Sequence, residues 1–201
     1  MRSILEKEII LNILTCVFCR VRTISNVMTY NHFSDNIVFM DGEFTSLNAC
    51  TGELLSVGLV KYTGEESYVE IAYEGPVDPW VTKNVLPQLR GPVVSKEEAR
   101  EHIKAFIGDS RPFCVAYVNQ FDSIFWYKLF DSPKRHPVFW LPIDFAAILY
   151  GYGFDPESMN KKRFFDMIGV DKSAYAFHNA LEDARLLAET YKKFFEHLKK
   201  A

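Results

Sequence analysis

The sequence lacks an excess of basic charge. Its 201 residues include 23 lysines and arginines against 26 aspartates and glutamates, which gives a formal net charge of -3 at pH 7. Proteins that grip long duplex nucleic acid through its phosphates usually present a basic surface, so the composition argues against that class. A cluster of acids that binds divalent cations would also bias the count negative. Local binding of a nucleotide or a single-stranded end is therefore still compatible with the composition.

Cysteine is scarce, and its spacing excludes a disulfide framework. The four cysteines are Cys16, Cys19, Cys50 and Cys114. Their pattern fits a reducing compartment, so we predict a cytoplasmic protein. Cys16 and Cys19 have the spacing of half a zinc site, but neither a second cysteine pair nor a suitably spaced histidine pair follows them. We expect Cys50 and Cys114 to be ordinary loop or apolar positions.

The N-terminal region has no apolar run long enough to cross a membrane. Residues 9–19 are apolar, but a spanning helix needs about 20 such residues. Charged residues flank the run on both sides, and no small-x-small cleavage site follows it, so a secretory signal is a weak interpretation. The sequence therefore predicts no membrane partner.

Residues 1–35 differ in character from the rest of the chain. We predict that they are an N-terminal extension, either dispensable or not native: either Met28 is the natural start, or residues 1–30 are a dispensable appendage. The remaining residues, 36–201, contain no internal repeat, low-complexity tract or linker. At this length and with 48% apolar residues in the whole chain, we expect a single domain around one core.

Hydrophobic periodicity predicts strands followed by alternating strands and helices. Apolar runs and alternation predict three successive strands at 37–40, 54–60 and 68–73. The continuous apolar run 113–118 is typical of a buried parallel strand. Helices are expected at 95–108, from Ile124 to Phe130, at 143–150, and from Ala180 to Leu198. This order predicts an α/β fold with helices packed on a mixed sheet.

Four carboxylates and one histidine fall at the ends of these elements. Asp41 and Glu43 close the first strand, where side chains two residues apart share a face. Asp122 follows the buried strand, and Asp183 lies in the first turns of the last helix, just after His178. Magnesium and manganese prefer such oxygen ligands, and histidine suits proton transfer at neutral pH. The set predicts a site for two divalent ions and hydrolysis of a phosphodiester, with at least one raised carboxylate pKa in the metal-free protein.

Each of these residues also has an ordinary structural interpretation. Asp41 and Glu43 alone fit a solvated strand end, and Asp122 alone fits a helix N-cap. Asp183 alone fits a surface acid near a helix N-terminus, and His178 alone a capping or surface residue. Their joint occurrence at the ends of elements that one sheet would bring together favours the catalytic interpretation.

The order of these residues resembles the DEDDh 3'-to-5' exonucleases, the family of ribonuclease T, oligoribonuclease and the proofreading subunit of bacterial replicative polymerase. The likeness runs from Asn36 to Phe195 and rests on three motifs. They are Phe39-Met40-Asp41-Gly42-Glu43-Phe44, Phe121-Asp122, and His178-Asn179-Ala180-Leu181-Glu182-Asp183-Ala184. The segment 80–87 also resembles the branch called ribonuclease AS, which trims adenylate-rich RNA ends.

The resemblance implies a fold, an activity and site residues. The fold is ribonuclease H-like, with three layers and a mixed five-stranded sheet flanked by helices. The activity is hydrolysis of single-stranded nucleic acid from the 3' end to nucleoside 5'-monophosphates, with RNA favoured and with two Mg²⁺ or Mn²⁺ ions. The metal ligands would be Asp41, Glu43, Asp122 and Asp183, the general base His178, and the wedge against the terminal nucleotide Phe44 and Leu47.

Two other functions stay open at this point. One is a non-catalytic module on the same fold that binds nucleic acid or protein, although buried acids without metal bring no benefit to such a module. The other is a phosphoesterase that acts on free nucleotides. The resemblance also leaves homodimer formation as a possibility, because several members of the family dimerise.

Overall fold

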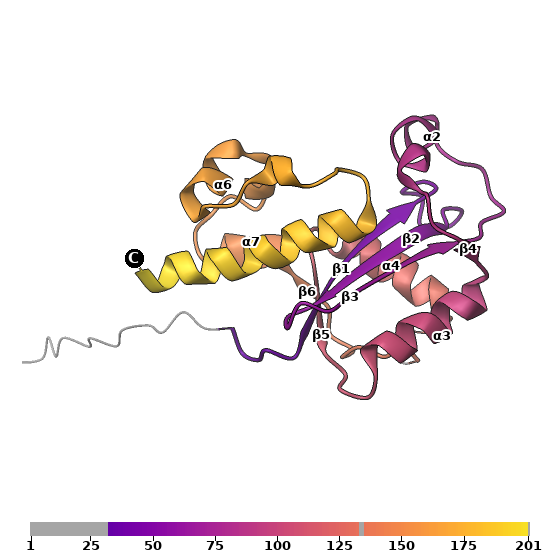
Figure 1. The fold of residues 1–201 in the computed structure, drawn as a ribbon, viewed down its shortest axis with the longest axis horizontal. Coiled ribbons are helices and arrows are strands. Elements are labelled where there is room, and N and C mark those ends of the chain that lie inside the picture. The colour runs from indigo at the N-terminus through magenta and orange to yellow at the C-terminus, as the bar shows by residue number, and fades with distance from the viewer. Residues whose placement is uncertain (1–31, 133–134, 201) are drawn as a thin grey trace, which may run out of the picture. The chain divides into compact units, whose positions relative to one another are not determined.

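The computed structural model describes residues 32–132 and 135–200, which build a six-stranded sheet with the order β4-β3-β2-β1-β5-β6 (Figure 1). β1 pairs antiparallel with β2 and parallel with β5. β2 pairs antiparallel with β3, whereas β3–β4 and β5–β6 are parallel pairs. The sheet is therefore mixed. The strands are β1 (Ile37–Phe44), β2 (Leu54–Lys61), β3 (Glu66–Ile71), β4 (Val93–Val94), β5 (Phe113–Ala116) and β6 (Ile143–Asp144).

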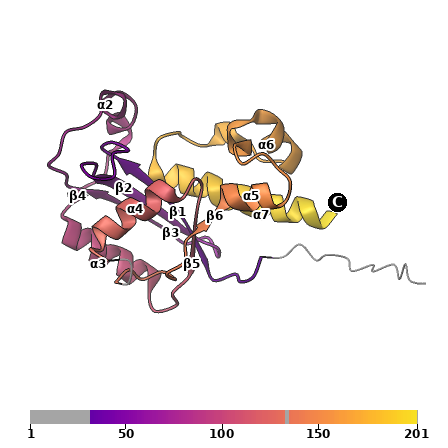
Figure 2. The same ribbon diagram turned by 180° about the vertical axis from the view of Figure 1, so that it is seen from behind.

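Helices cover both faces of this sheet. The long helix α7 lies across one face, whereas α3 and α4 pack on the other, as the two opposite views show (Figures 1 and 2). Ser95 begins α3 with a reciprocal capping box to Glu98, as the serine at that position predicts. The helices are α2 (Pro79–Asn84), α3 (Lys96–Ile107), α4 (Gln120–Leu129), α5 (Phe145–Gly151), α6 (Lys162–Ile168) and α7 (Ala180–Lys200). Short 3-10 turns are Leu86–Gln88, Ser158–Asn160 and Lys172–Ala174.

Alternation along β1 divides its side chains between the two layers. Val38 and Met40 belong to the core cluster that includes α3 and α4 side chains. Phe39 points to the α7 layer, where its ring lies 5.2 Å from the Tyr191 ring, centroid to centroid. Asp41 and Glu43 continue the series of Phe39 at two-residue steps, so they share the face that α7 covers. The strand thus directs two carboxylates toward the start of a helix that carries a third.

The prediction of five strands is wrong by one. β4 and β6 have two residues each, too few for a periodic signal, and they form only because neighbouring strands offer paired partners. The predicted helix 143–150 accordingly begins with strand β6, and α5 starts at Phe145 after an N-cap by Asp144. The predicted strand 113–118 ends at Ala116, because the chain turns at Val118 with a positive φ of 57°. The mixed, helix-flanked architecture is as predicted.

Part of the predicted N-terminal extension lies outside the described residues, including Met28, Cys16 and Cys19. Its last residues are described: the His32 ring contacts the rings of Tyr62, Tyr191 and Phe195 at centroid distances of 5.1, 5.7 and 5.6 Å. A chain that starts at Met28 would retain this contact. The boundary and dispensability of the extension stay predictions.

Two further sequence expectations concern cysteines and membrane helices. Cys50 is exposed in a loop and Cys114 is buried in β5, both with free thiols, as expected. Within the described residues, none of the helices combines the length and the apolar character that crossing a membrane requires.

Candidate metal centre

Three of the predicted carboxylates meet at one point. Asp41 and Glu43 from β1 and Asp183 from α7 each offer an oxygen, and these oxygens lie within 4.8 Å of one another. Oxygen ligands bind Mg²⁺ at about 2.1 Å and Ca²⁺ at about 2.4 Å, so this spacing is compatible with a shared cation. Carboxylates without sulfur or nitrogen ligands form the donor set that hard divalent ions prefer. The residues therefore fit a magnesium- or manganese-type site.

Asp122 lies beside this group rather than within it. It occupies the first turn of α4, is 7% exposed, and its Oδ1 accepts a hydrogen bond of 3.0 Å from the Gly42 backbone N–H. Gly42 separates Asp41 from Glu43, so Asp122 is held next to both acids. The expectation that Asp122 follows the strand directly is imprecise: β5 ends at Ala116 and the residue belongs to the helix.

Burial raises the pKa of every acid in this centre, and repulsion between the acids raises the pKa of Asp41 and Glu43 further. The pKa of Asp41 lies well above its ordinary value, through burial first and then the charges of Asp122, Asp183 and Glu43. Burial and the charges of Asp183 and Asp122 raise the pKa of Glu43 to about 8. Burial raises the pKa of Asp122 to about 8 against opposing backbone hydrogen bonds. Burial likewise raises the pKa of Asp183 to about 6, although backbone N–H groups and Lys172 act in the opposite direction. The expectation of a raised carboxylate pKa thus agrees with the geometry.

Gly58 allows α7 to approach the sheet at this centre. It is the β2 partner of Asp41 in the sheet register. A Cβ at Gly58 would lie 2.1 Å from the Ala180 carbonyl oxygen and 2.4 Å from the Leu181 nitrogen. The first turn of α7 therefore sits directly on the backbone of β2, which brings Asp183 to Asp41. The sequence offers only an unremarked glycine within an apolar strand.

We expect Gly58→Ala to lower the free energy of unfolding by about 1–3 kcal/mol, because backbone atoms must move to make room for the methyl group. Urea unfolding of the purified variant measures this. Gly151→Ala is the matched control, since a Cβ there meets nothing within 4 Å. Equal stability of the two variants would contradict the close approach of α7 to β2.

His178 is held at the mouth of the site by its backbone and by an aromatic neighbour. Its φ of 63° lies in the left-handed region, which histidine tolerates better than most residues. The backbone N–H donates to Oδ2 of Asp183 at 3.0 Å. Its ring meets the Trp80 ring edge to face, at a centroid distance of 4.9 Å and an interplanar angle of 87°. His178 thus stands beside the acids with an exposed imidazole.

Two adjoining cavities open at the centre. One, of about 370 Å³, is lined by Asp41, Glu43, Asp183 and His178 among others. The second, of about 360 Å³, is lined mainly by apolar side chains that include Phe44, Leu47 and Trp80. Both predicted wedge residues therefore border the site: Phe44 is partly buried and stacked on Phe125, whereas Leu47 is 59% exposed.

Trp80 is a site residue that sequence reasoning did not single out for a role. It is the second residue of the short helix α2 and is 54% exposed, an unusual position for a tryptophan. It lines both cavities at the centre. The available signal was Asp78-Pro79, an N-cap followed by proline, which marks a helix start and leaves Trp80 in the first turn.

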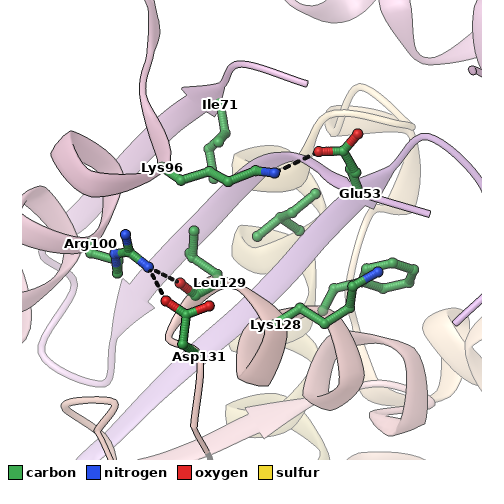
Figure 3. A pocket seen from close by; sticks show the side chains of 9 residues that line it. Glu53, Ile71, Lys96, Arg100, Lys128, Leu129 and Asp131 are labelled. Carbon is green, nitrogen blue, oxygen red and sulfur yellow. Dashed lines mark hydrogen bonds and ion pairs between the residues drawn. The ribbon is translucent and has the colours of Figure 1, made fainter. Parts of the chain in front are cut away.

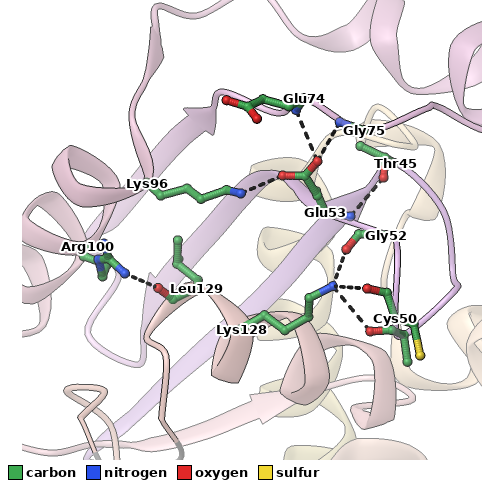
Figure 4. A network of polar contacts seen from close by, with 11 residues as sticks. Thr45, Cys50, Gly52, Glu53, Glu74, Gly75, Lys96, Arg100, Lys128 and Leu129 are labelled. Atoms are coloured by element: carbon green, nitrogen blue, oxygen red, sulfur yellow. Dashed lines mark hydrogen bonds and ion pairs between the residues drawn. The ribbon is translucent and has the colours of Figure 1, made fainter.

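The loop that carries Leu47 is anchored from α4. Lys128 Nζ donates to the carbonyl oxygens of Ala49, Cys50 and Gly52 (Figure 4). At the end of the loop, the Glu53 N–H donates to Thr45 Oγ1 at 2.9 Å. These contacts connect the loop to the same helix that carries Asp122.

A separate cavity of about 140 Å³ lies between α3, α4 and the sheet (Figure 3). Its basic groups already have partners. Lys96 pairs with Glu53 at 2.6 Å, and Arg100 donates to the Leu129 carbonyl at 3.0 Å and to Asp131 at 2.7 Å. We therefore assign it to packing of the α3 and α4 layer.

Comparisons with known proteins identify the fold. No family model and no curated protein matches the chain. Among solved structures it is similar to the zinc-bound complex of E. coli exonuclease I with single-stranded DNA, with a TM-score of 0.56 and 15% identity over 78% of this chain. A second exonuclease I structure gives a TM-score of 0.58 at 15% identity over the same share. A 3'-exonuclease that recognises the histone mRNA stem-loop gives 0.56 at 13% identity over 86%.

These similarities confirm the ribonuclease H-like α/β fold. The chain spans 39% and 40% of the two exonuclease I chains and 66% of the histone mRNA exonuclease. At identities of 13–15% the likeness concerns the fold. Function must be argued from the site.

Proposed function

We propose that the protein is a divalent-metal-dependent 3'-to-5' exonuclease that removes nucleoside 5'-monophosphates from a single-stranded 3' end. The observation that carries this proposal is the convergence of Asp41, Glu43 and Asp183 beside His178. The solved structures with the same fold are named as exonucleases, bound to single-stranded DNA or recognising an RNA 3' end. The fold and the donor set therefore support the same chemistry.

Four side chains would hold the metal. Asp41, Glu43 and Asp183 are the direct candidates because their carboxylate oxygens lie within 4.8 Å of one another. Asp122 has one oxygen engaged by Gly42 N–H, and its other oxygen is the candidate ligand for a second ion. Bound Mg²⁺ or Mn²⁺ ions lower the pKa of water and neutralise charge on a leaving oxygen, which is the chemistry that phosphodiester hydrolysis requires.

His178 is the proposed general base. Its imidazole is exposed at the cleft, and the Trp80 ring and the hydrogen bond from His178 N–H to Asp183 fix its position. It would accept the proton of the attacking water as the bond to phosphorus forms and the 3'-oxygen departs. The strained backbone at this residue is consistent with a functional position.

The terminal nucleotide would occupy the apolar cavity. Phe44, Leu47 and Trp80 offer apolar and aromatic surface next to the acids, and stacking on a base contributes about 1–3 kcal/mol with little sequence preference.

RNA is the favoured polymer because the segment 80–87 resembles the ribonuclease AS branch. We further propose cytoplasmic location on the cysteine pattern, and homodimer formation by analogy with the same family.

One gel experiment tests the reaction and its polarity. RNA and DNA oligomers with a 5' label, single- and double-stranded, are incubated with Mg²⁺, Mn²⁺ or chelator. We expect a ladder of one-nucleotide steps from the 3' end of single-stranded RNA, which chelator abolishes. A binding module would shift the oligomers without products, and a phosphoesterase of free nucleotides would leave them intact. Either result would overturn the proposal.

A further inference from the structure

Lys172 is a basic side chain on the wall of the acidic cleft. It begins the 3-10 turn Lys172–Ala174 and lines the cavity that contains Asp41, Asp183 and His178. Among the described residues that line this cavity, it is the one lysine or arginine.

The Lys172 side chain is held in place before any ligand arrives. Its ammonium lies 5.2 Å from the centroid of the Phe165 ring and 5.0 Å from that of Phe177. Nζ also donates a hydrogen bond of 2.8 Å to the Met159 carbonyl oxygen. An ammonium has three N–H groups, so two further donors are available. Less side-chain entropy is then lost when an anion binds.

Lys172 differs in its partners from two lysines of the nearby basic run 161–163. Lys161 forms an ion pair with Asp155, and Lys162 pairs with Asp166 at 2.6 Å. No carboxylate in the described part of the chain lies within ion-pair distance of Lys172. The unneutralised charge at the cleft therefore belongs to Lys172.

We propose that Lys172 binds a non-bridging oxygen of the substrate phosphate immediately upstream of the scissile one, an inference that rests on the proposed exonuclease function. The metal site would neutralise the scissile phosphate, whereas the next phosphate also enters the acidic cleft and needs a cation from the protein. The cleft lining supports this division, since Phe44, Leu47 and Trp80 offer surface for bases, while Lys172 and Asn160 offer polar groups.

The test combines a protein variant with a modified substrate. The substrates are one oligonucleotide with all phosphates intact and one with a neutral methylphosphonate at the linkage next to the scissile bond. Lys172→Met keeps an unbranched side chain of similar length beside Phe165 and Phe177 but removes the charge. Lys172→Arg restores the charge, and Lys162→Met is the matched control. The measurement is kcat and KM for each pair, with thermal unfolding as a check on folding.

We expect Lys172→Met to lower kcat/KM on the intact strand about 10-fold, mainly through KM, as for loss of one charge-assisted hydrogen bond. Lys172→Arg should recover most of this loss, and Lys162→Met should resemble the wild type. The methylphosphonate should impair the wild type by a similar factor and leave Lys172→Met almost unchanged, because the two changes remove the same contact.

Independent losses from the variant and the methylphosphonate would overturn the inference, and so would an unimpaired wild type on the neutral linkage. The measurement on the wild type needs no variant, so an unimpaired wild type overturns the inference even if Lys172→Met folds poorly. Failure of the wild type to degrade any oligonucleotide would instead defeat the proposed function itself.

Discussion

Asp183→Asn should abolish most of the activity and yet stabilise the metal-free protein. The substitution keeps the shape of the side chain and an oxygen that can accept the His178 N–H, but it removes one negative charge from the carboxylate group of three. Metal ions contribute several kcal/mol to stabilisation of the transition state, so weaker binding should lower kcat by about 10³-fold. Removal of repulsion on Asp41 and Glu43 should raise the free energy of unfolding in chelator by about 1 kcal/mol.

A loss of activity together with a gain in metal-free stability distinguishes a metal ligand from a structural residue. Glu182→Gln is the matched control, because Glu182 is the preceding residue of α7 but pairs with Arg185 outside the acid group. It should change neither turnover nor metal-free stability substantially. The measurements are single-turnover cleavage of a labelled oligomer and urea unfolding in chelator. Loss of stability in Asp183→Asn together with near-normal turnover would refute the role of Asp183 as a ligand.

The acids and their supporting elements could be predicted because each carries a strong local signal. β1 is a continuous apolar run that ends in two acids two positions apart. Side chains at i and i+2 of a strand lie on the same face, so strand geometry alone directs Asp41 and Glu43 to one face. α7 has an apolar stripe over its whole length, which fixes both its existence and the face that it buries. Asp183 follows from its place at the start of that helix.

Other features of the site depend on contacts between distant residues, and no local pattern reports them. The approach of Ala180 to Gly58 brings together residues 122 positions apart, and only the assembled sheet and helix reveal that a side chain would not fit there. The Trp80–His178 ring contact likewise joins α2 to the loop before α7. β4 and β6 exist through pairing with longer strands, so their two-residue sequences carry no signal of their own.

In the metal-free protein, stability should fall steeply as the pH rises from about 5 to about 8.5. The pKa of Glu43 and of Asp122 is raised to about 8 and that of Asp183 to about 6, mainly by burial. In the unfolded chain these groups titrate near pH 4. Between those values the folded state binds more protons than the unfolded state, so the free energy of unfolding decreases with pH. The stabilisation that these acids provide is fully present below about pH 4 and is lost as the pH rises through their folded pKa values. The total loss in the free energy of unfolding is on the order of several kcal/mol.

A melting series in chelator, with and without added Mn²⁺, measures this effect. Acids with lowered pKa, such as Glu53 beside Lys96, lose their contribution below about pH 4.5 and so act outside the window. We expect Tm to drop by about 10 °C across the window in chelator. Mn²⁺ should remove most of the drop, since a bound cation favours the ionised acids and the folded state together. Asp183→Asn should make the dependence of Tm on pH in chelator shallower, because Asp41 and Glu43 then lose the repulsion from the Asp183 charge. A flat wild-type curve in chelator would mean that the pKa values of these carboxylates are not raised in the folded state. A drop that Mn²⁺ does not reduce would mean that these carboxylates do not share a cation.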